Sequence, residues 1–459
     1  GDGHGRPQRN ADRVVDAALP WLEEHSGQPF FCWLHFYDPH MEYLDHRESF
    51  GDRFKDSPYD AEIAYVDLQL RRLIDWLETR KIADETMIVV VGDHGEGLDE
   101  HRERWHGYLL YNSTLEVPLI VSHPPLRAAG TRVAAPVSIV DIGATVLDVL
   151  GIPDRDQFGG RSLKAALEGE ALSADDCYAA TDEGYLEEGW SPLRCLISDR
   201  WKYIRTTKPE LYDLMSDPHE LTNLADAHAE TVRELEERLG ALEARGFRHE
   251  AQPVGLSERE RMVLDSLGYL GDPSPRDPAD EGDRPDIKDS LEALFAFQGA
   301  QALYRTGRRE EAMARLQTVI DEYPRYLAPQ LMAGRMLESS GQLTRAREVF
   351  EEVLKAEADN KEANARVGKL LTTEGRWQEA LPYLRRALTA DARGNHAIVA
   401  TSALPLLLQE LERNPDSADL HYVVAKMLRA LGRHPEAVAH MRAAEMSVRR
   451  SAPDRESSN

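Results

Sequence analysis

Aspartate and histidine stand together directly after one apolar run, in an arrangement that suits metal binding. The segment Gly92-Asp-His-Gly-Glu96 follows Met87–Val91. In parallel α/β folds, ligands bind beyond the carboxyl ends of strands, and a carboxylate beside an imidazole suits a divalent cation. We therefore predict that Asp93 and His94 are metal ligands. A plain strand-end turn with an aspartate cap is the alternative.

A second segment places two histidines and an aspartate at the end of another apolar run. His35, Asp38 and His40 lie within or just after residues 29–37. Histidine exchanges protons near neutral pH, which suits a general acid. His40 follows Pro39 and lies beyond the expected strand, so we predict that it is catalytic. His35 is expected to be a core histidine.

A third segment, Glu100–Gly107, carries His101 and His106 ahead of an apolar run at residues 117–121. Taken alone, it has the composition of a solvated loop. Three histidine-bearing loops that each flank a predicted parallel strand nevertheless favour one shared site. We expect the polar residues of the three loops to converge at the carboxyl edge of the sheet.

The elements that would position these loops alternate between strand and helix. Apolar runs with the character of buried strands lie at residues 29–37, 87–91 and 117–121, and amphipathic helices are expected at residues 11–24, 59–80 and 139–150. Such alternation predicts a mostly parallel sheet covered by helices. Farther along, residues 196–205 are expected to form a hairpin, with Asp199-Arg200 at its turn, and residues 227–243 a helix.

Beyond a linker rich in Pro, Asp, Arg and Glu at residues 271–286, the chain repeats itself every 34 residues. The same spacing separates glycines, alanines and large apolar residues, namely Gly307, Gly341 and Gly375; Ala312, Ala346 and Ala380; Leu303, Leu337 and Leu371; and Leu316, Phe350 and Leu384. This period is the tetratricopeptide signature. Gly432, Ala437 and Met441 continue it, with a degenerate unit expected around Ala403 and Leu407.

We therefore predict an all-α tetratricopeptide (TPR) solenoid over residues 290–448, built of antiparallel helix pairs. The Ala and Gly positions should lie at close helix contacts, and Leu316, Phe350, Leu384 and Met441 should point inward. A concave face on such a solenoid would bind a protein or peptide partner. A spacer without a ligand is the alternative.

Net charge, apolar content and cysteine spacing argue against some classes of protein. The net charge of −26 argues against binding to a nucleic-acid backbone, which needs clustered Lys and Arg. No run of 18 apolar residues is present, so no transmembrane helix is predicted. Cys32, Cys177 and Cys195 form no Cys-x-x-Cys pair, so neither a zinc knuckle nor a disulfide framework is expected.

Several segments, in order and in spacing, resemble the sulfatase family of the alkaline phosphatase superfamily. They are Pro29-Phe-Phe…His35-x-x-Asp38-Pro-His40, Tyr59-x-x-Glu62-Ile-Ala-Tyr-Val-Asp67, Gly92-Asp-His-Gly-Glu-Gly-Leu-x-Glu-His101, His106-Gly…Leu115-x-Val-Pro-Leu-Ile120, Val137-Ser-Ile-Val-Asp141-Ile-Gly-Ala-Thr145, Leu211-Tyr-Asp-Leu…Asp217-Pro-x-Glu220…Asn223-Leu224 and Ser266-Leu-Gly-Tyr-Leu270. The resemblance covers residues 1 to about 271.

The resemblance implies an α/β sandwich around a mostly parallel sheet, with a catalytic domain at residues 1–245 and a small C-terminal subdomain from about residue 156. Residues 246–289 would be a tail helix and linker, and residues 449–459 a disordered tail. The resemblance also favours a periplasmic or extracytoplasmic location, although the sequence itself leaves the compartment open.

The resemblance also implies roles for the site residues. Asp93 and His94 would bind a divalent cation, for which calcium is favoured and magnesium or manganese are alternatives. His40 would protonate the leaving group. His106 would grip the sulfate where the family often has lysine, and His101 would add a substrate contact. Many sulfatases have asparagine where this chain has His94, and that difference leaves phosphodiesters and phosphonate monoesters open as substrates.

The family's nucleophile is a formylglycine, matured from the cysteine or serine of a Cys/Ser-x-Pro/Ala-x-Arg motif. The sulfatase-like part contains no such motif, and none of the three cysteines begins one. By the resemblance, the nucleophile and the remaining metal ligands would precede residue 1, so we expect a catalytic domain truncated at its N-terminus and without turnover. A catalytically inert repeat scaffold is the remaining alternative.

Overall fold

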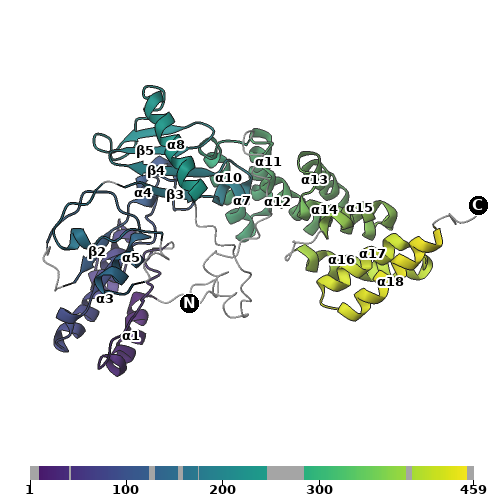
Figure 1. Ribbon diagram of the computed structural model, residues 1–459. Coiled ribbons are helices and arrows are strands. Elements are labelled where there is room, and N and C mark those ends of the chain that lie inside the picture. The colour runs from purple at the N-terminus through teal and green to yellow at the C-terminus, as the bar shows by residue number, and fades with distance from the viewer. Residues whose placement is uncertain are drawn as a thin grey trace, which may run out of the picture. The chain divides into compact units, whose positions relative to one another are not determined.

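The computed structural model describes residues 10–40, 43–123, 130–153, 159–173, 175–245, 284–388 and 395–451. The described chain forms two compact units (Figure 1). The first comprises residues 10–181 and 193–245, and the second comprises residues 182–192 and 284–451. None of the described helices combines the length and apolar character needed to cross a membrane.

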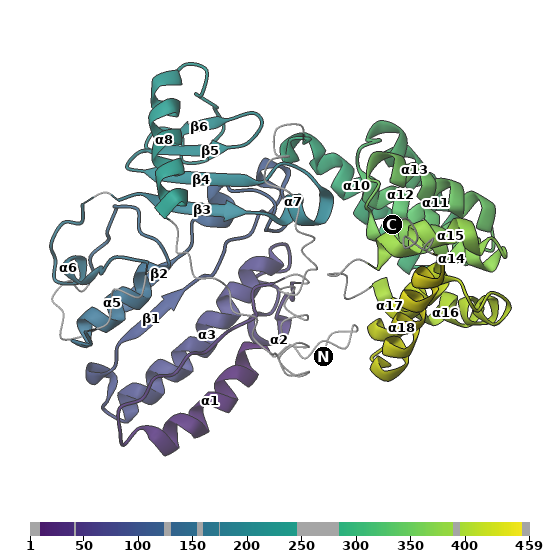
Figure 2. The same ribbon diagram turned by 45° about the vertical axis from the view of Figure 1, so that its right-hand side comes forward.

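Two long helices open the first unit and confirm the amphipathic patterns. α1 (Ala11–His25) buries Val15 and Leu22, and it packs beside α3 (Pro58–Thr79), as Figure 2 shows. A proline occupies the first turn of α3, where a missing N–H costs nothing. Short helices lie between and after them: α2 (Arg47–Phe50), η1 (Ala83–Glu85), η2 (Glu100–Arg102), α4 (Asn112–Leu115) and α6 (Lys164–Leu167).

The first sheet contains two strands, and they are antiparallel. β1 (Ile88–Val91) pairs with β2 (Leu119–Ser122), with Val89 opposite Val121. Alternate side chains of both strands line a small apolar cavity with α5 (Asp141–Val149). The predicted mostly parallel sheet is therefore wrong for the described residues, because the two apolar runs that do form strands pair with each other in opposite directions.

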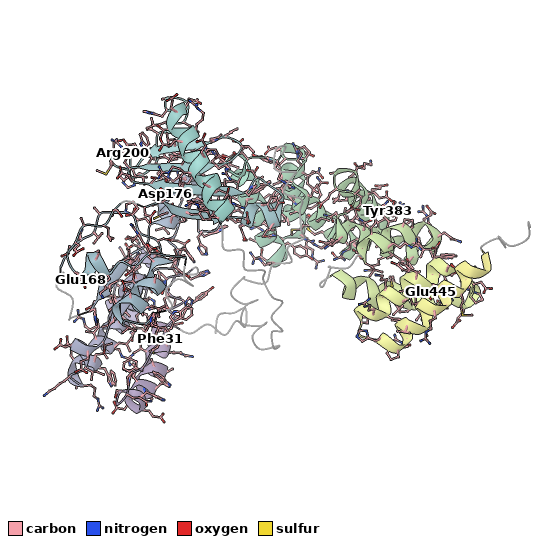
Figure 3. The ribbon with its side chains drawn as sticks, viewed as in Figure 1. Phe31, Glu168, Asp176, Arg200, Tyr383 and Glu445 are labelled. Atoms are coloured by element: carbon pink, nitrogen blue, oxygen red, sulfur yellow. The ribbon has the colours of Figure 1, made fainter. Side chains whose placement is uncertain are left out.

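The third apolar run, residues 29–37, forms no strand in the structure. Its side chains alternate in burial, and Phe31 and Trp33 remain 81% and 80% exposed (Phe31 is labelled in Figure 3). One face of β2 is likewise open, with Ile120 60% exposed. These residues were expected to be buried on both faces, and the described chain covers them on one face only.

A second sheet follows, in the order β3-β4-β5-β6 with antiparallel neighbours. Its strands are β3 (Cys177–Thr181), β4 (Leu193–Ser198), β5 (Trp201–Arg205) and β6 (Glu210–Asp213). The predicted hairpin is confirmed, with Asp199 and Arg200 at the turn between β4 and β5 (Arg200 is labelled in Figure 3). α8 (Ala229–Arg245) packs on β4 and β5 through Leu235 and Leu239 (Figure 2).

The repeats form successive helices, as the 34-residue period predicts. They are α10 (Ile287–Arg305), α11 (Arg309–Glu322), α12 (Leu327–Ser339), α13 (Leu343–Ala356), α14 (Lys361–Thr373), α15 (Trp377–Ala387), α16 (Asn395–Arg413), α17 (Ala418–Ala430) and α18 (His434–Ser451). Gly307, Gly341, Gly375 and Gly432 each follow a helix with φ between +72° and +81°, which a β-carbon would strain. The four glycines are therefore the turns of the repeats.

The repeat core confirms most of the inward positions. Leu316, Phe350 and Leu384 are fully buried, as are Ala312, Ala346 and Ala380. Met441 is only half-buried. The degenerate unit is the single long helix α16, in which Ala403 and Leu407 are fully buried. The predicted linker at residues 271–286 lies largely outside the described residues.

The second unit also contains residues 182–192, which the sequence placed in the catalytic domain. This segment includes α7 (Glu183–Glu188), and Gly184 lies so close to Ile287 that a β-carbon would come within 2.6 Å of its Cδ1. Trp190 is 2% exposed and its ring lies 5.2 Å from that of Tyr326. Residues 182–192 therefore pack as part of the repeat core, which a 34-residue pattern cannot reveal.

Candidate functional site

The turn after β1 presents Asp93 and His94 at the end of the strand. Gly95 allows the turn to pack against α4, because a β-carbon there would stand 2.3 Å from the Ser113 carbonyl oxygen. The Gly95 N–H donates to the Thr114 carbonyl at 2.8 Å. The predicted strand-end position of the pair is therefore confirmed, and both side chains are exposed.

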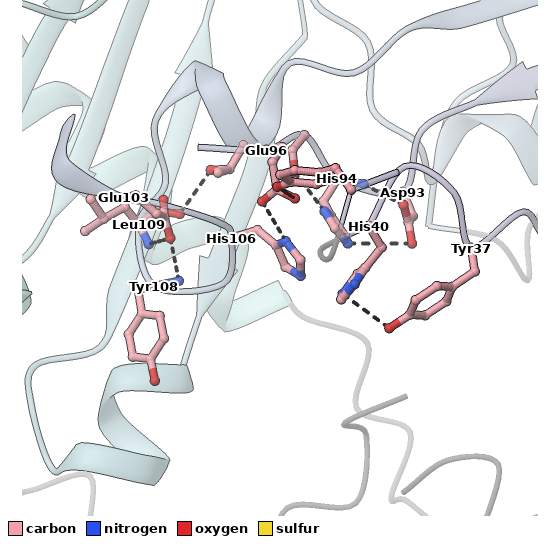
Figure 4. Close-up of polar contacts among 12 residues, drawn as sticks. Tyr37, His40, Asp93, His94, Glu96, Glu103, His106, Tyr108 and Leu109 are labelled. Atoms are coloured by element: carbon pink, nitrogen blue, oxygen red, sulfur yellow. Dashed lines mark hydrogen bonds and ion pairs between the residues drawn. The ribbon is translucent and has the colours of Figure 1, made fainter. Parts of the chain in front are cut away.

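The His94 ring is oriented by its own turn (Figure 4). Its Nδ1 lies 2.8 Å from the Gly95 carbonyl oxygen, which can only accept, so Nδ1 carries the proton. The other ring nitrogen, Nε2, is then the one with a lone pair, and it lies 3.9 Å from Asp93 Oδ2. Metal-binding histidines commonly donate one ring N–H to a carbonyl and bind the ion with the other nitrogen.

Three predicted histidines come together beside this turn. The His94 and His106 rings lie 3.9 Å apart, and the His40 ring lies 5.5 Å from that of His106. The His40 ring also lies 4.5 Å from that of Tyr37, tilted by 35° (Figure 4). The structure thus places His40, Asp93, His94 and His106 in one group, which we call the histidine cluster.

Glu96 supports the cluster, and the sequence interpretation gave it no role. It is 8% exposed, accepts a hydrogen bond from the Tyr43 hydroxyl at 2.8 Å and lies 3.1 Å from His106 Nδ1 (Figure 4). Burial alone would raise the pKa of Glu96, but the hydrogen bonds from His106 and Tyr43 hold it below its ordinary value. Its place two residues after His94 was the available signal.

The loop that carries His106 is held by a second buried carboxylate. Glu103 is 2% exposed, and its Oε1 accepts hydrogen bonds from the backbone N–H groups of Tyr108 and Leu109 at 2.9 and 3.0 Å (Figure 4). Burial raises the pKa of Glu103 to about 7. His106 is therefore positioned by its own loop as well as by Glu96.

His101 makes its contacts outside the histidine cluster. Its ring stacks at 3.7 Å on Tyr111, and its Nε2 lies 3.0 Å from the His219 carbonyl oxygen. These contacts tie η2 to the loop after β6. A substrate contact for His101 stays a prediction.

None of the cysteines has the properties of a nucleophile. Burial raises the pKa of the Cys177 thiol to about 11 and that of Cys195 to about 12, and it also raises the pKa of Cys32. A thiolate is the reactive form, so burial disfavours reaction of these thiols near neutral pH. The serine form of the sulfatase motif does occur by its letters at Ser451–Arg455, after the repeats, where residues 452–455 lie outside the described chain.

Family models match two parts of the chain. The Sulfatase family model matches residues 4–152, and the model for the N-sulphoglucosamine sulphohydrolase C-terminal region matches residues 100–245. Tetratricopeptide repeat models match residues 296–326, 331–395 and 400–455.

Individual relatives include arylsulfatase K of Gallus gallus, 33% identical over 194 residues, which are 40% of this chain and 36% of that protein. Choline-sulfatase of Rhizobium meliloti is 34% identical over 175 residues, 37% of this chain and 32% of that protein. The chain spans about a third of the length of the relatives it matches.

Two solved structures are also similar. A putative sulfatase from Bacteroides fragilis has a TM-score of 0.45 at 20% identity, covering 51% of this chain and 58% of that one. The phosphonate monoester hydrolase of Agrobacterium radiobacter has a TM-score of 0.37 at 25% identity, covering 53% of this chain and 51% of that one.

Proposed function

Residues 4–245 belong to the sulfatase family and are followed by tetratricopeptide repeats, and from this premise we propose that the complete protein hydrolyses a sulfate ester. The observation that carries the proposal is the histidine cluster: two histidines meet an Asp-His pair at the end of β1. Such a group combines a cation site with proton donors, which ester hydrolysis requires.

Asp93 and His94 would hold a divalent cation. The fit rests on the His94 tautomer, which leaves Nε2 with its lone pair, and on the exposed Asp93 carboxylate next to it. Calcium is the ion that the family favours, with magnesium or manganese as alternatives; an imidazole nitrogen suits the softer manganese better than calcium. A bound cation would screen the ester's negative charge and stabilise charge that develops in the transition state.

The remaining residues of the cluster would handle the anionic group and the proton. The Nδ1–H of His106 faces the Glu96 carboxylate, so the other ring nitrogen would donate to a sulfate oxygen in the doubly protonated imidazolium form of His106. His40 would donate a proton to the leaving oxygen as its bond to sulfur breaks. The nucleophile would come from another part of the complete protein, because the family's motif is missing from residues 4–245.

The open apolar surface supports an extended catalytic domain. Phe31, Trp33 and Ile120 leave well over half of their side-chain surface exposed along a segment and a strand that lie beside the site. Exposed apolar patches on soluble proteins mark interfaces. We infer that further residues of the complete protein cover this face and bring the nucleophile to the histidine cluster.

His94 keeps a second activity open. An imidazole in place of the asparagine expected of many sulfatases alters the charge and ligand type of the cation site, so hydrolysis of a phosphodiester or phosphonate monoester is the alternative. The test uses protein expressed from the complete open reading frame, with 4-nitrophenyl sulfate and phenyl 4-nitrophenylphosphonate as competing substrates.

We expect turnover of the sulfate ester and a loss of at least about 100-fold on chelation of the metal or in Asp93→Asn, because cation stabilisation supplies several kcal/mol. Asp99→Asn, an exposed aspartate in the same loop, is the matched control and should retain activity. Faster cleavage of the phosphonate would establish the alternative. If the folded protein turned over neither substrate, the catalytically inert scaffold would be the remaining interpretation.

For the repeats we propose a protein or peptide partner. α12 and α14 face each other through ion pairs of Arg335 with Glu362 and of Glu338 with Arg366 and Lys369. Charge reversal at Lys369 is expected to abolish specific capture of the partner in a pull-down, whereas charge reversal at the exposed Lys355 of α13 should not. Equal capture by both variants would place the binding face elsewhere.

A further inference from the structure

A second group of ligand-type side chains lies outside the histidine cluster. Asp38, His46 and Glu62 each offer one ligand atom, and these atoms lie within 4.8 Å of one another. Within the residues that the structure describes, no other group of three histidine, cysteine or acidic side chains is so close. Asp38 and His46 lie on the loop that carries His40, and Glu62 lies in the second turn of α3.

The three residues are enclosed by the protein. The side chains of His46 and Glu62 are only 8% and 4% exposed, and His46 Nε2 lies 3.0 Å from Glu62 Oε2. The His46 ring stacks at 4.0 Å on Tyr65, which fixes its plane. The other Glu62 oxygen accepts a hydrogen bond from the Leu44 N–H at 2.7 Å.

One carboxyl oxygen of Asp38 remains unsatisfied in this arrangement. Among the residues that the structure describes, no hydrogen-bond donor reaches its buried Oδ2. Burial, and after it the neighbouring Glu62 carboxylate, raise the pKa of Asp38 to about 6. The group thus brings two carboxyl groups and one imidazole together in a largely buried place, and buried carboxylates need a compensating cation or proton.

We propose that Asp38, His46 and Glu62 bind a divalent transition-metal ion, such as Zn²⁺ or Mn²⁺, at a site separate from Asp93 and His94. One imidazole nitrogen and two carboxylate oxygens are the ligand types that such ions accept. Ligand atoms around a tetrahedral ion with bonds of about 2.0–2.1 Å lie roughly 3.3 Å apart, so atoms that are now within 4.8 Å of one another would close by up to about 1.5 Å on binding.

A bound ion would have a consequence for the catalytic loop. Asp38 and His46 flank His40, so an ion shared with Glu62 fastens both ends of this loop to α3. The ion would fix the loop and take no part in the reaction itself. This site does not depend on the proposed sulfatase activity, because its ligands and its ion can be measured in the 459-residue chain.

The test is metal content and cobalt spectroscopy on the purified 459-residue chain. After chelation and gel filtration, Zn²⁺ or Co²⁺ is added, and bound metal is counted by mass spectrometry. Visible d–d absorption of Co²⁺ reports nitrogen and oxygen ligation. We expect one tightly bound equivalent that is lost in Glu62→Gln and in His46→Gln and retained in Asp45→Asn, which alters an exposed carboxylate next to His46.

The Asp93→Asn/His94→Gln double variant separates the two sites, and it should retain the equivalent held by Glu62. Circular dichroism of each variant establishes that it is folded. Zinc or cobalt binding that is absent, or that survives Glu62→Gln in the folded chain, overturns the proposal and indicates that the two carboxylates share a proton instead.

Discussion

The buried ion pair between Lys202 and Glu220 gives a prediction whose size follows from the structure. The Lys202 side chain is 0% exposed and that of Glu220 is 1% exposed, and Nζ lies 2.6 Å from Oε1. Asn112 completes the group: its side-chain oxygen accepts from Lys202 Nζ at 2.9 Å, and its backbone N–H donates to Glu220 Oε2 at 2.6 Å. The pair thereby fastens β5 to the start of α4.

Replacing Lys202 by methionine keeps most of the side-chain volume but leaves the Glu220 carboxylate buried without a countercharge. Removing one partner of a buried ion pair typically costs about 3–5 kcal/mol, so the opening equilibrium of β5 should rise by about 100-fold or more. The double variant Lys202→Met/Glu220→Gln removes the uncompensated charge, and we expect it to recover most of the loss.

Native-state hydrogen exchange measured by mass spectrometry is the appropriate assay, because it follows the β4–β6 amides separately from the repeats. Arg233→Met, which breaks the exposed pair with Glu230, is the control and should leave exchange unchanged. If Lys202→Met exchanged like wild type, or the double variant were worse than the single one, the reasoning about buried charge would be refuted.

Three further changes test other parts of the structure. Gly334→Ala should destabilise the repeats by about 1–3 kcal/mol in urea unfolding, because its Cβ would stand 2.6 Å from the Phe350 ring. The control Gly299→Ala places its Cβ against only the flexible end of an arginine and should be neutral or slightly stabilising. Equal effects of the two substitutions would contradict the packing around Gly334. Trp190→Ala should lower the free energy of unfolding of the second unit by about 3–5 kcal/mol. If the thermal melt of the helices, followed by circular dichroism, is unchanged in this variant, residues 182–192 are not part of the repeat core. Burial raises the pKa of Glu103 in the folded protein to about 7, above its value in the unfolded chain, so its stabilising contribution is complete below about pH 4.5 and is lost as pH rises through 7. Glu103→Gln should remove about 3 kcal/mol of this pH dependence of the free energy of unfolding. An unchanged pH profile of stability in the variant would argue against this role of Glu103.

Periodicity predicted the helices well, because each amphipathic pattern needs only its own neighbours along the chain. α1, α3 and α8 lie close to their expected ranges, and the 34-residue period located the four turn glycines. Turn chemistry likewise located the hairpin between β4 and β5. These features depend on local backbone geometry, which residue types report directly.

Strand pairing was harder to predict from the sequence, because an apolar run indicates a strand but neither its partner nor its direction. Residues 87–91 and 117–121 were expected to lie in a parallel sheet and instead pair antiparallel, while residues 29–37 pair with no described strand. The positions of Asp93 after β1 and of His40 after the apolar run at residues 29–37 were still informative, since both residues lie in the histidine cluster. Glu96, Glu103 and the Asp38 group were missed because their meaning depends on burial, which the sequence alone does not give.

The central claim is that the histidine cluster is the reaction site, and the leaving-group dependence of His40→Ala tests it most directly. The measurement compares kcat/KM of the complete protein for 4-nitrophenyl sulfate, whose leaving group needs no proton, with that for an alkyl sulfate, whose leaving group does. If His40 is the general acid, the variant should lose about 100- to 10,000-fold on the alkyl ester and far less on the nitrophenyl ester. His25→Ala, at the exposed end of α1, should match wild type on both. Equal losses on the two esters, or no loss on either, would contradict the assignment of the site.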